Sequence, residues 1–180
     1  MLVVENFLPY VERLPKRESS SINLAVIHCT ELPDLRMARE FGERVLYEQS
    51  GTGVSGHYYI DRTGEIHQYV PEDRIANHVI GYNGRSIGIE LVNRGRYPNW
   101  YASKSQIATE SYPAEQIESL KELLTDLKHR LINLQRIARH SDLDQGEIPA
   151  SDNPDVFIRR KIDPGPCFPW DDLVRFWQTL

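Results

Sequence analysis

Three polar residues with the chemistry of metal ligands stand beside apolar segments of the chain. His28 closes the apolar run 24–27, His140 follows the short run 137–139, and Asp163 opens a proline-rich stretch. Two imidazoles and one carboxylate, with a fourth position open to water, form a known type of catalytic zinc site. Because the three residues are far apart in the sequence, their pattern alone leaves open that His28 is an ordinary buried histidine.

The elements that would position these residues are visible as apolar patterns. The run that ends at His28 has no Gly or Pro and is typical of a strand buried on both faces. The predicted strands are 23–30, 54–61, 65–70, 86–93 and 137–140, with a hairpin turn at 62–64. Leucines three and four residues apart predict a long helix that follows Pro113 and reaches Leu131. Two shorter helices are predicted, one capped by Asp34 and reaching about Gln49, the other capped by Asp171 and reaching Trp177.

The length and composition fit one globular domain. The chain has 180 residues, of which 40% are hydrophobic and 26% charged. A net charge of −5 gives no electrostatic footprint for nucleic acid, and two cysteines are too few for a disulfide framework. No segment approaches the roughly 20 apolar residues of a membrane span, and the N-terminus lacks a basic signal-peptide region. We therefore expect a cytoplasmic protein, although release or signal-independent export stays open.

Two segments stand apart from the predicted core. Residues 1–21 carry prolines and a polar run, and we expect them to form an extended N-terminal arm ahead of a catalytic domain at residues 22–180. Residues 94–111 form a long polar and aromatic excursion, and loops of this length are usually functional or mobile.

An ordered set of short motifs now points to a family. The chain resembles the N-acetylmuramoyl-L-alanine amidases of the amidase-2 family, to which T7-type phage lysozymes and peptidoglycan recognition proteins also belong. The matching segments are Ala25-Val26-Ile27-His28, Val54-Ser55-Gly56-His57-Tyr58, Ser86-Ile87-Gly88-Ile89-Glu90-Leu91, Ala138-Arg139-His140-Ser141-Asp142 and Arg160-Lys161-Ile162-Asp163-Pro164-Gly165-Pro166. The resemblance implies a single α/β domain, with a central mixed β-sheet flanked by helices and a zinc cleft at one edge.

The resemblance also implies roles for five residues. His28, His140 and Asp163 match the Zn²⁺ ligands, Glu90 matches the catalytic carboxylate, and Lys161 matches the lysine two residues before the third ligand. Glu90 would move protons as a general acid–base, and Lys161 would stabilise the oxyanion of the intermediate. The expected reaction is hydrolysis of the amide between the lactyl group of N-acetylmuramic acid and L-alanine, in peptidoglycan fragments or muropeptides.

Glu90 and Lys161 also have plainer interpretations. Glu90 would pair with a buried arginine, and Lys161 would extend the basic face of Arg159 and Arg160. We expect His57 to be structural or to line the cleft. By the same resemblance, His78 and Asn83 are predicted substrate contacts, because family members line the substrate groove with this loop.

Three remaining side chains receive no catalytic role. We expect His67 to be exposed, and His129 to interact with the C-terminal end of the long helix. Cys167 is a second candidate for the third ligand, since a thiolate binds zinc strongly. The resemblance favours Asp163 for that role, and Cys167 is then predicted to be a small buried packing residue.

Two other functions are alternatives to an amidase. A non-catalytic peptidoglycan recognition module keeps the fold but loses a zinc ligand, whereas this chain retains all three and Glu90. A zinc peptidase of another kind would carry a His-Glu-x-x-His helix, which is absent from the sequence. The size of the chain and the lack of a signal peptide favour an enzyme of muropeptide recycling. The loop 78–86 is shorter than in the cytosolic recycling enzymes of the family, whereas the excursion 94–111 is long, so the loops favour a broader range of substrates.

Overall fold

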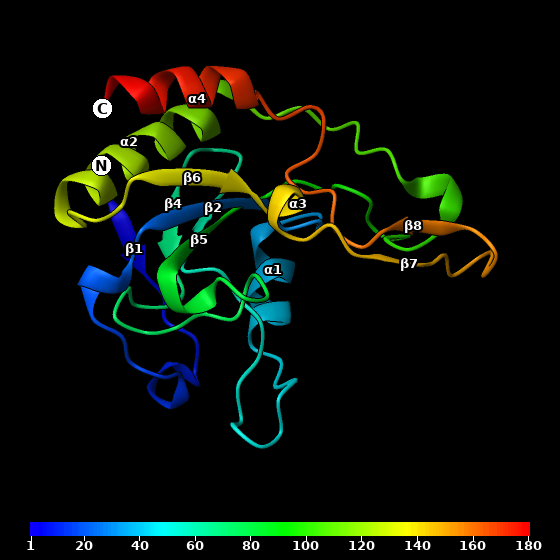
Figure 1. Ribbon diagram of the computed structural model, residues 1–180, viewed down its shortest axis with the longest axis horizontal. Helices are drawn as coiled ribbons and strands as arrows, with labels where there is room; N and C mark the ends of the chain where they lie inside the picture. The colour runs from blue at the N-terminus through cyan, green and yellow to red at the C-terminus, as the bar shows by residue number, and fades with distance from the viewer.

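A six-stranded mixed sheet forms the centre of the computed structural model, which describes residues 1–180 (Figure 1). The strands are β1 (Val3–Glu5), β2 (Leu24–Cys29), β3 (Tyr58–Ile60), β4 (Ile66–Gln68), β5 (Ser86–Leu91) and β6 (Arg136–Arg139), in the spatial order β1-β4-β3-β5-β2-β6. Only β3 and β4 pair antiparallel, and every other neighbouring pair is parallel. The predicted single-domain α/β fold with a mixed sheet flanked by helices is confirmed.

The two central strands explain why the sheet is rigid. All six residues of β2 are buried, and so are five of the six residues of β5. Parallel strands covered on both faces favour such continuous apolar runs over alternating ones. The register pairs His28 with Glu90, so a predicted ligand and the predicted catalytic carboxylate lie on adjacent strands.

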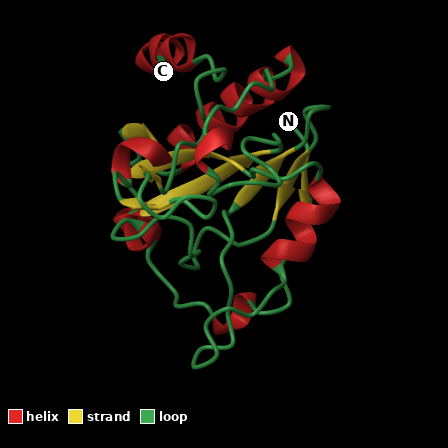
Figure 2. Cartoon of the chain, turned by 90° about the vertical axis from the view of Figure 1, so that its right-hand side faces the viewer, coloured by secondary structure: helices red, strands yellow, loops and turns green.

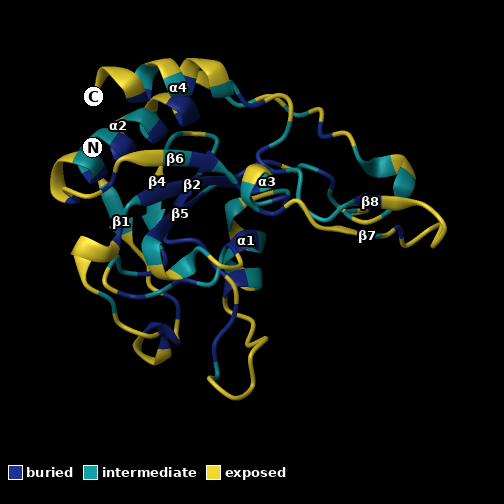
Figure 3. Cartoon of the chain, in the orientation of Figure 1, coloured by how far each residue is buried: buried dark blue, intermediate teal, exposed yellow.

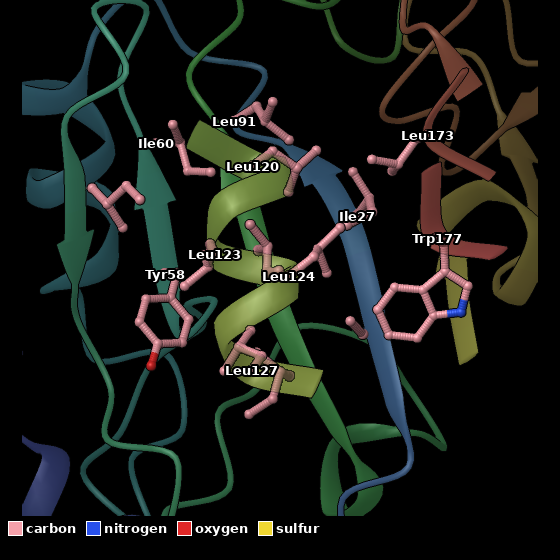
Figure 4. Close-up of a cluster of buried hydrophobic side chains, with 14 of the residues drawn as sticks. Ile27, Tyr58, Ile60, Leu91, Leu120, Leu123, Leu124, Leu127, Leu173 and Trp177 are labelled. Carbon is pink, nitrogen blue, oxygen red and sulfur yellow. The ribbon is translucent and has the colours of Figure 1, made fainter. Parts of the chain in front are cut away.

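Helices cover both faces of the sheet (Figure 2). On one face, α2 (Ala114–Arg130) and α4 (Trp170–Thr179) enclose the larger hydrophobic core. Figure 4 shows the leucines of α2 pointing onto the strands, with Trp177 of α4 beside them. The other face packs against α1 (Leu35–Gly42) and a second buried cluster. Adjacent residues of β3 alternate between the two cores, Tyr58 in the first and Tyr59 in the second.

The N-terminal segment, predicted as an extended arm, is packed into the domain. β1 pairs in parallel with β4 at the edge of the sheet. Leu8, Tyr10 and Leu14 are buried in the second core, and Tyr10 donates a hydrogen bond to the carbonyl oxygen of Gly42 at 2.7 Å. Apolar residues between the prolines therefore bury surface against α1 and β3.

Several element boundaries differ from the predicted ones. The first helix ends at Gly42 instead of about Gln49, and residues 43–50 form an exposed loop (Figure 3). Asp34 caps that helix as predicted, accepting from the backbone N–H of Met37. Asp171 is no cap, because α4 begins one residue earlier, after Pro169. The hairpin is confirmed, but its strands are shorter than predicted.

The C-terminal half also contains short elements that periodicity did not predict. These are α3 (His140–Leu143), the two-stranded antiparallel sheet of β7 (Glu147–Pro149) and β8 (Phe157–Arg159), and 3-10 turns at Val11–Arg13, Ser19–Ser21, Asn83–Arg85 and Ser103–Ser105. In Figure 1 the β7–β8 ribbon extends away from the main sheet. None of the helices combines the length and the apolar character that crossing a membrane would require.

Candidate metal centre

His28, His140 and Asp163 meet in one buried cluster. The Nδ1 atoms of the two histidines are 2.9 Å apart. Asp163 Oδ2 lies 3.2 Å from His28 Nδ1 and 3.0 Å from His140 Nδ1. All three side chains are buried, and their candidate ligand atoms lie within 4.8 Å of one another.

The sheet topology brings these residues together. β2 and β6 are parallel neighbours, and their register pairs Ile27 with Arg139. The residues that follow in the chain are His28 in β2 and His140 at the start of α3, and both therefore lie at the same C-terminal edge of the sheet. Asp163 is brought to this edge by its own carbonyl oxygen, which accepts from the N–H of Ser141 at 3.1 Å.

The donor set fits a divalent metal such as zinc. Burial and the neighbouring His140 lower the pKa of His28 to about 4, so its imidazole is neutral at pH 7. Burial raises the pKa of Asp163, but the two histidines outweigh burial and hold it well below 3.8. The second carboxylate oxygen, Oδ1, is buried without a hydrogen-bond partner, which is costly unless a ligand satisfies it. Two imidazoles and one carboxylate are the ligand types of open zinc sites.

Glu90 stands beside the cluster on β5. Its Oε1 atom is 3.8 Å from His28 Nδ1, and its side chain is 14% exposed. Burial and the negative charge of Asp163 raise the pKa of Glu90 to about 8, while Lys161 acts in the opposite direction. Gly56 makes room for it, since a Cβ at that position would lie 2.8 Å from Glu90 Cγ. Glu90 is therefore a partly accessible carboxyl group that can exchange a proton near neutral pH.

Lys161 lines the same pocket two residues before Asp163. Burial lowers the pKa of its ammonium group, but the Asp163 and Glu31 carboxylates outweigh burial and the net shift is upward. Lys161 is therefore a stable cation facing the cleft, suited to stabilising negative charge.

His78 and Asn83, predicted as substrate contacts, also line the pocket, and both form hydrogen bonds to other residues of the protein. His78 Nδ1 lies 3.0 Å from His28 Nε2, and His78 Nε2 lies 3.1 Å from Ser86 Oγ. Asn83 Oδ1 accepts the backbone N–H groups of His78 and Val79 at 3.1 and 2.7 Å. A direct role of these two residues in substrate binding stays a prediction.

The other predicted side chains have these positions. His57 is fully buried and its Nδ1 accepts from the backbone N–H of Gly88 at 3.0 Å, which agrees with a structural role. His67 was expected to be exposed, but only 13% of its side chain is accessible, because it lies on β4 within the sheet. His129 is exposed in the last turn of α2.

Cys167 does not belong to the metal cluster, and its predicted burial is wrong. The residue is exposed, and its Sγ atom lies 3.6 Å from the carbonyl oxygen of Ala108. The tight turn at Gly165, where φ is +86°, carries the chain away from the cluster after Asp163.

A cavity of about 560 Å³ opens beside the cluster. Its lining includes the apolar and aromatic side chains of Phe41, Tyr47, Val54 and Ile80. It also includes Tyr101, from the excursion 94–111, together with Arg160 and Lys161. The volume is ample for a small-molecule or short-peptide substrate.

A buried ion pair that the sequence did not predict holds together the part of the pocket lining that contains Arg160 and Lys161. Arg96 donates to both carboxylate oxygens of Glu31, at 2.7 and 2.8 Å. The same guanidinium donates to the carbonyl oxygens of Arg159 and Arg160, each at 3.1 Å. The excursion is thereby anchored to the segment that leads to Lys161. Neither residue lies in a motif, and the length of the excursion indicated only a functional or mobile loop.

A second unpredicted residue, Arg17, comes from the N-terminal segment. Its guanidinium donates to the carbonyl oxygens of Ser86 and Asn83, at 2.7 and 3.0 Å. It thus holds the loop that carries His78. The polar run around it in the sequence predicted an extended arm and did not indicate that Arg17 is partly buried.

Comparison with known proteins agrees with the fold and identifies the family. The family model described as Amidase_2, N-acetylmuramoyl-L-alanine amidase, matches residues 18–166. The chain belongs to this family.

Relatives of known name are moderately similar in sequence. N-acetylmuramoyl-L-alanine amidase AmiD of Escherichia coli is 30% identical over 138 residues, which cover 68% of this chain and 44% of AmiD. Protein RC0497 of Rickettsia conorii is 29% identical over 179 residues, which cover 92% of this chain and 57% of that protein. The chain thus spans about half the length of these curated relatives.

Solved structures share the fold. N-acetylmuramoyl-L-alanine amidase LysC from Clostridium intestinale superposes with a TM-score of 0.67 at 22% identity, covering 97% of this chain and 96% of LysC. Escherichia coli AmiD, in a complex with anhydro-N-acetylmuramic acid-L-Ala-D-γ-Glu-L-Lys, has a TM-score of 0.64 at 26% identity, covering 87% of this chain and 57% of that chain.

Proposed function

We propose that the protein hydrolyses the amide bond between the lactyl group of N-acetylmuramic acid and L-alanine, in peptidoglycan or muropeptides. The observation that carries this proposal is the convergence of a His-His-Asp cluster with Glu90 and Lys161 at one cavity. Membership of the amidase family and the muropeptide bound by the similar AmiD structure support the choice of substrate.

The cofactor we propose is Zn²⁺, held by His28, His140 and Asp163. When bound, zinc would supply a Lewis acid that lowers the pKa of water to about 7 and polarises a carbonyl oxygen. The chain's own contribution is the state of two of these donors, because burial keeps His28 neutral and the histidines keep Asp163 ionised.

Two further side chains move or stabilise charge. Glu90 accepts a proton from the attacking water at its carboxylate and returns it to the departing nitrogen of L-alanine. The 3.8 Å distance between its Oε1 atom and His28 Nδ1 supports this role. Lys161 keeps its positive charge and stabilises the oxyanion that forms on the carbonyl oxygen.

The decisive test is digestion of two substrates, anhydro-muropeptides and whole sacculi, followed by mass spectrometry. The expected products are stem peptides with a free L-alanine amino group and glycan that retains the lactyl group. A chelator should abolish their release and added Zn²⁺ should restore it. Full activity of metal-free protein would contradict the proposal.

Glu90→Gln provides the matched control. This variant should keep the fold and the bound zinc but lose on the order of 10²–10⁴-fold in turnover. Loss of zinc instead would make Glu90 a ligand. Muropeptide binding without cleavage by the zinc-loaded wild-type protein would favour the recognition module.

A further inference from the structure

His78 contacts the metal cluster through the ring nitrogen of His28 that faces away from His140 and Asp163. His28 presents Nδ1 to His140 and Asp163, and its other ring nitrogen, Nε2, lies 3.0 Å from His78 Nδ1. The two rings meet edge to face, with centroids 5.1 Å apart. His78 Nε2 in turn lies 3.1 Å from Ser86 Oγ, and that hydroxyl donates to the carbonyl oxygen of Tyr82 at 2.8 Å.

The far end of this series sets the direction of every hydrogen bond. A carbonyl oxygen only accepts, so the Ser86 hydroxyl donates to Tyr82 and accepts from His78 Nε2–H. A neutral His78 then has a lone pair at Nδ1, which accepts from Nε2–H of His28. His28 is thereby left with its lone pair at Nδ1, the nitrogen that faces the cluster.

The surroundings hold His78 in this position. Asn83 Oδ1 accepts the backbone N–H of His78, and Arg17 donates to the carbonyl oxygens of Asn83 and Ser86. On β5, the absence of a side chain at Gly88 makes room for the ring, since a Cβ there would lie 2.6 Å from His78 Cγ and Nδ1. The imidazole is thus packed between β5 and His28.

We propose that His78 is a positioning residue: through the series Tyr82–Ser86–His78–His28 it holds His28 in the Nε2–H tautomer, with Nδ1 ready to bind the metal. This inference rests on the proposed zinc site. Partners of this kind fix the ring orientation and basicity of metal-binding histidines, and their loss typically weakens metal affinity about 10–100-fold.

The tautomer is measurable in metal-free protein by two-bond ¹H–¹⁵N NMR correlations of the histidine rings. For His28 we expect a proton on Nε2 and none on Nδ1. A predominant Nδ1–H form in the wild-type protein would overturn the proposal, whatever the protein's activity.

Two variants separate the bond to His28 from general packing. In His78→Asn, the amide oxygen stands where Nδ1 was and still accepts from His28, whereas in His78→Gln the amide stands where Nε2 was and that bond is lost. Zinc affinity, measured by competition with a chromophoric chelator, should fall about 10–100-fold in His78→Gln and less than about threefold in His78→Asn. Exposed His129→Gln is the control and should leave the affinity unchanged.

Equal affinity losses in the Asn and Gln variants, or none in either, would overturn the proposal. If His78→Gln fails to fold, Ser86→Ala carries the test: it should weaken zinc binding at least about threefold and give His28 a mixture of tautomers, and unchanged values would overturn the proposal. Zinc affinity and tautomer are read without substrate. A protein that binds zinc in this way but cleaves no muropeptide would therefore refute the proposed reaction and leave the role of His78 intact.

Discussion

Replacing Arg96 with methionine removes the cation that joins Glu31, Gln106 and residues 159–160 beside the pocket. The Arg96 side chain is 1% exposed and Glu31 is 9% exposed. The guanidinium donates to two carboxylate oxygens, two backbone carbonyls and Gln106 Oε1, all between 2.7 and 3.1 Å. Glu31 has a φ of +50°, unusual for a non-glycine residue, and its carbonyl accepts Trp100 Nε1–H at 2.8 Å. Such local strain persists only where surrounding contacts hold the residue.

The expected loss of stability follows from this burial. Methionine keeps much of the apolar volume but leaves the Glu31 carboxylate without its cation. Removing one partner of a buried ion pair costs about 3–5 kcal/mol, because the other charge remains buried and uncompensated. A domain of ordinary stability, about 5–15 kcal/mol, would remain folded but weakened. The double variant Arg96→Met with Glu31→Gln should lose less than Arg96→Met alone, since the unpaired charge is gone.

Urea unfolding followed by far-UV circular dichroism measures these free energies in metal-free protein. Arg36→Met is the matched control, because Arg36 and Glu40 form an exposed pair within one helix and 75% of the Arg36 side chain is accessible. It should cost no more than about 0.5 kcal/mol. A loss below about 1 kcal/mol for Arg96→Met, or strictly additive losses in the double variant, would refute the reasoning.

Three further outcomes are expected. Asp163→Ala should severely weaken zinc binding and end turnover, whereas Cys167→Ala should keep both, because the exposed thiol lies outside the cluster. The zinc stoichiometry of the two variants distinguishes the candidate ligands, and the reverse pattern would make Cys167 the ligand. Leu124→Ala, in the core beneath α2, should cost about 2–5 kcal/mol in urea unfolding, while the 86% exposed Ile132 should tolerate alanine within about 0.5 kcal/mol. Burial and Arg17 hold the pKa of His57 well below 6.5. Below about pH 6.5 this histidine is therefore protonated in the unfolded chain but stays neutral in the folded protein, and the free energy of unfolding decreases as the pH drops. This histidine should contribute a loss of about 1.4 kcal/mol by pH 5.5, and a His57→Asn variant with an unaltered pH profile would contradict that assignment.

Residues whose roles depend on their immediate neighbours in the chain could be predicted from the sequence. The spacing of leucines predicted α2, because a helix turns every 3.6 residues and buries one face. Unbroken apolar runs predicted β2 and β5, which the structure buries almost completely. His28, His140 and Asp163 were recognisable since each lies in a short ordered motif of the amidase family.

Tertiary structure decided everything that depends on contact between distant segments. His28 and His140 are 112 residues apart, and only the parallel pairing of β2 with β6 brings their Nδ1 atoms within 2.9 Å. The packing of Leu8, Tyr10 and Leu14 into the second core was not predicted, and the predicted burial of Cys167 is wrong, because the local pattern of polar residues and prolines does not reveal which surface a loop contacts. His78 illustrates the same limit. The family resemblance predicted a substrate contact for this residue, which stays a prediction. What the sequence did not predict is that its ring nitrogens lie 3.0 Å from His28 Nε2 and 3.1 Å from Ser86 Oγ, because the contact with His28 depends on long-range packing.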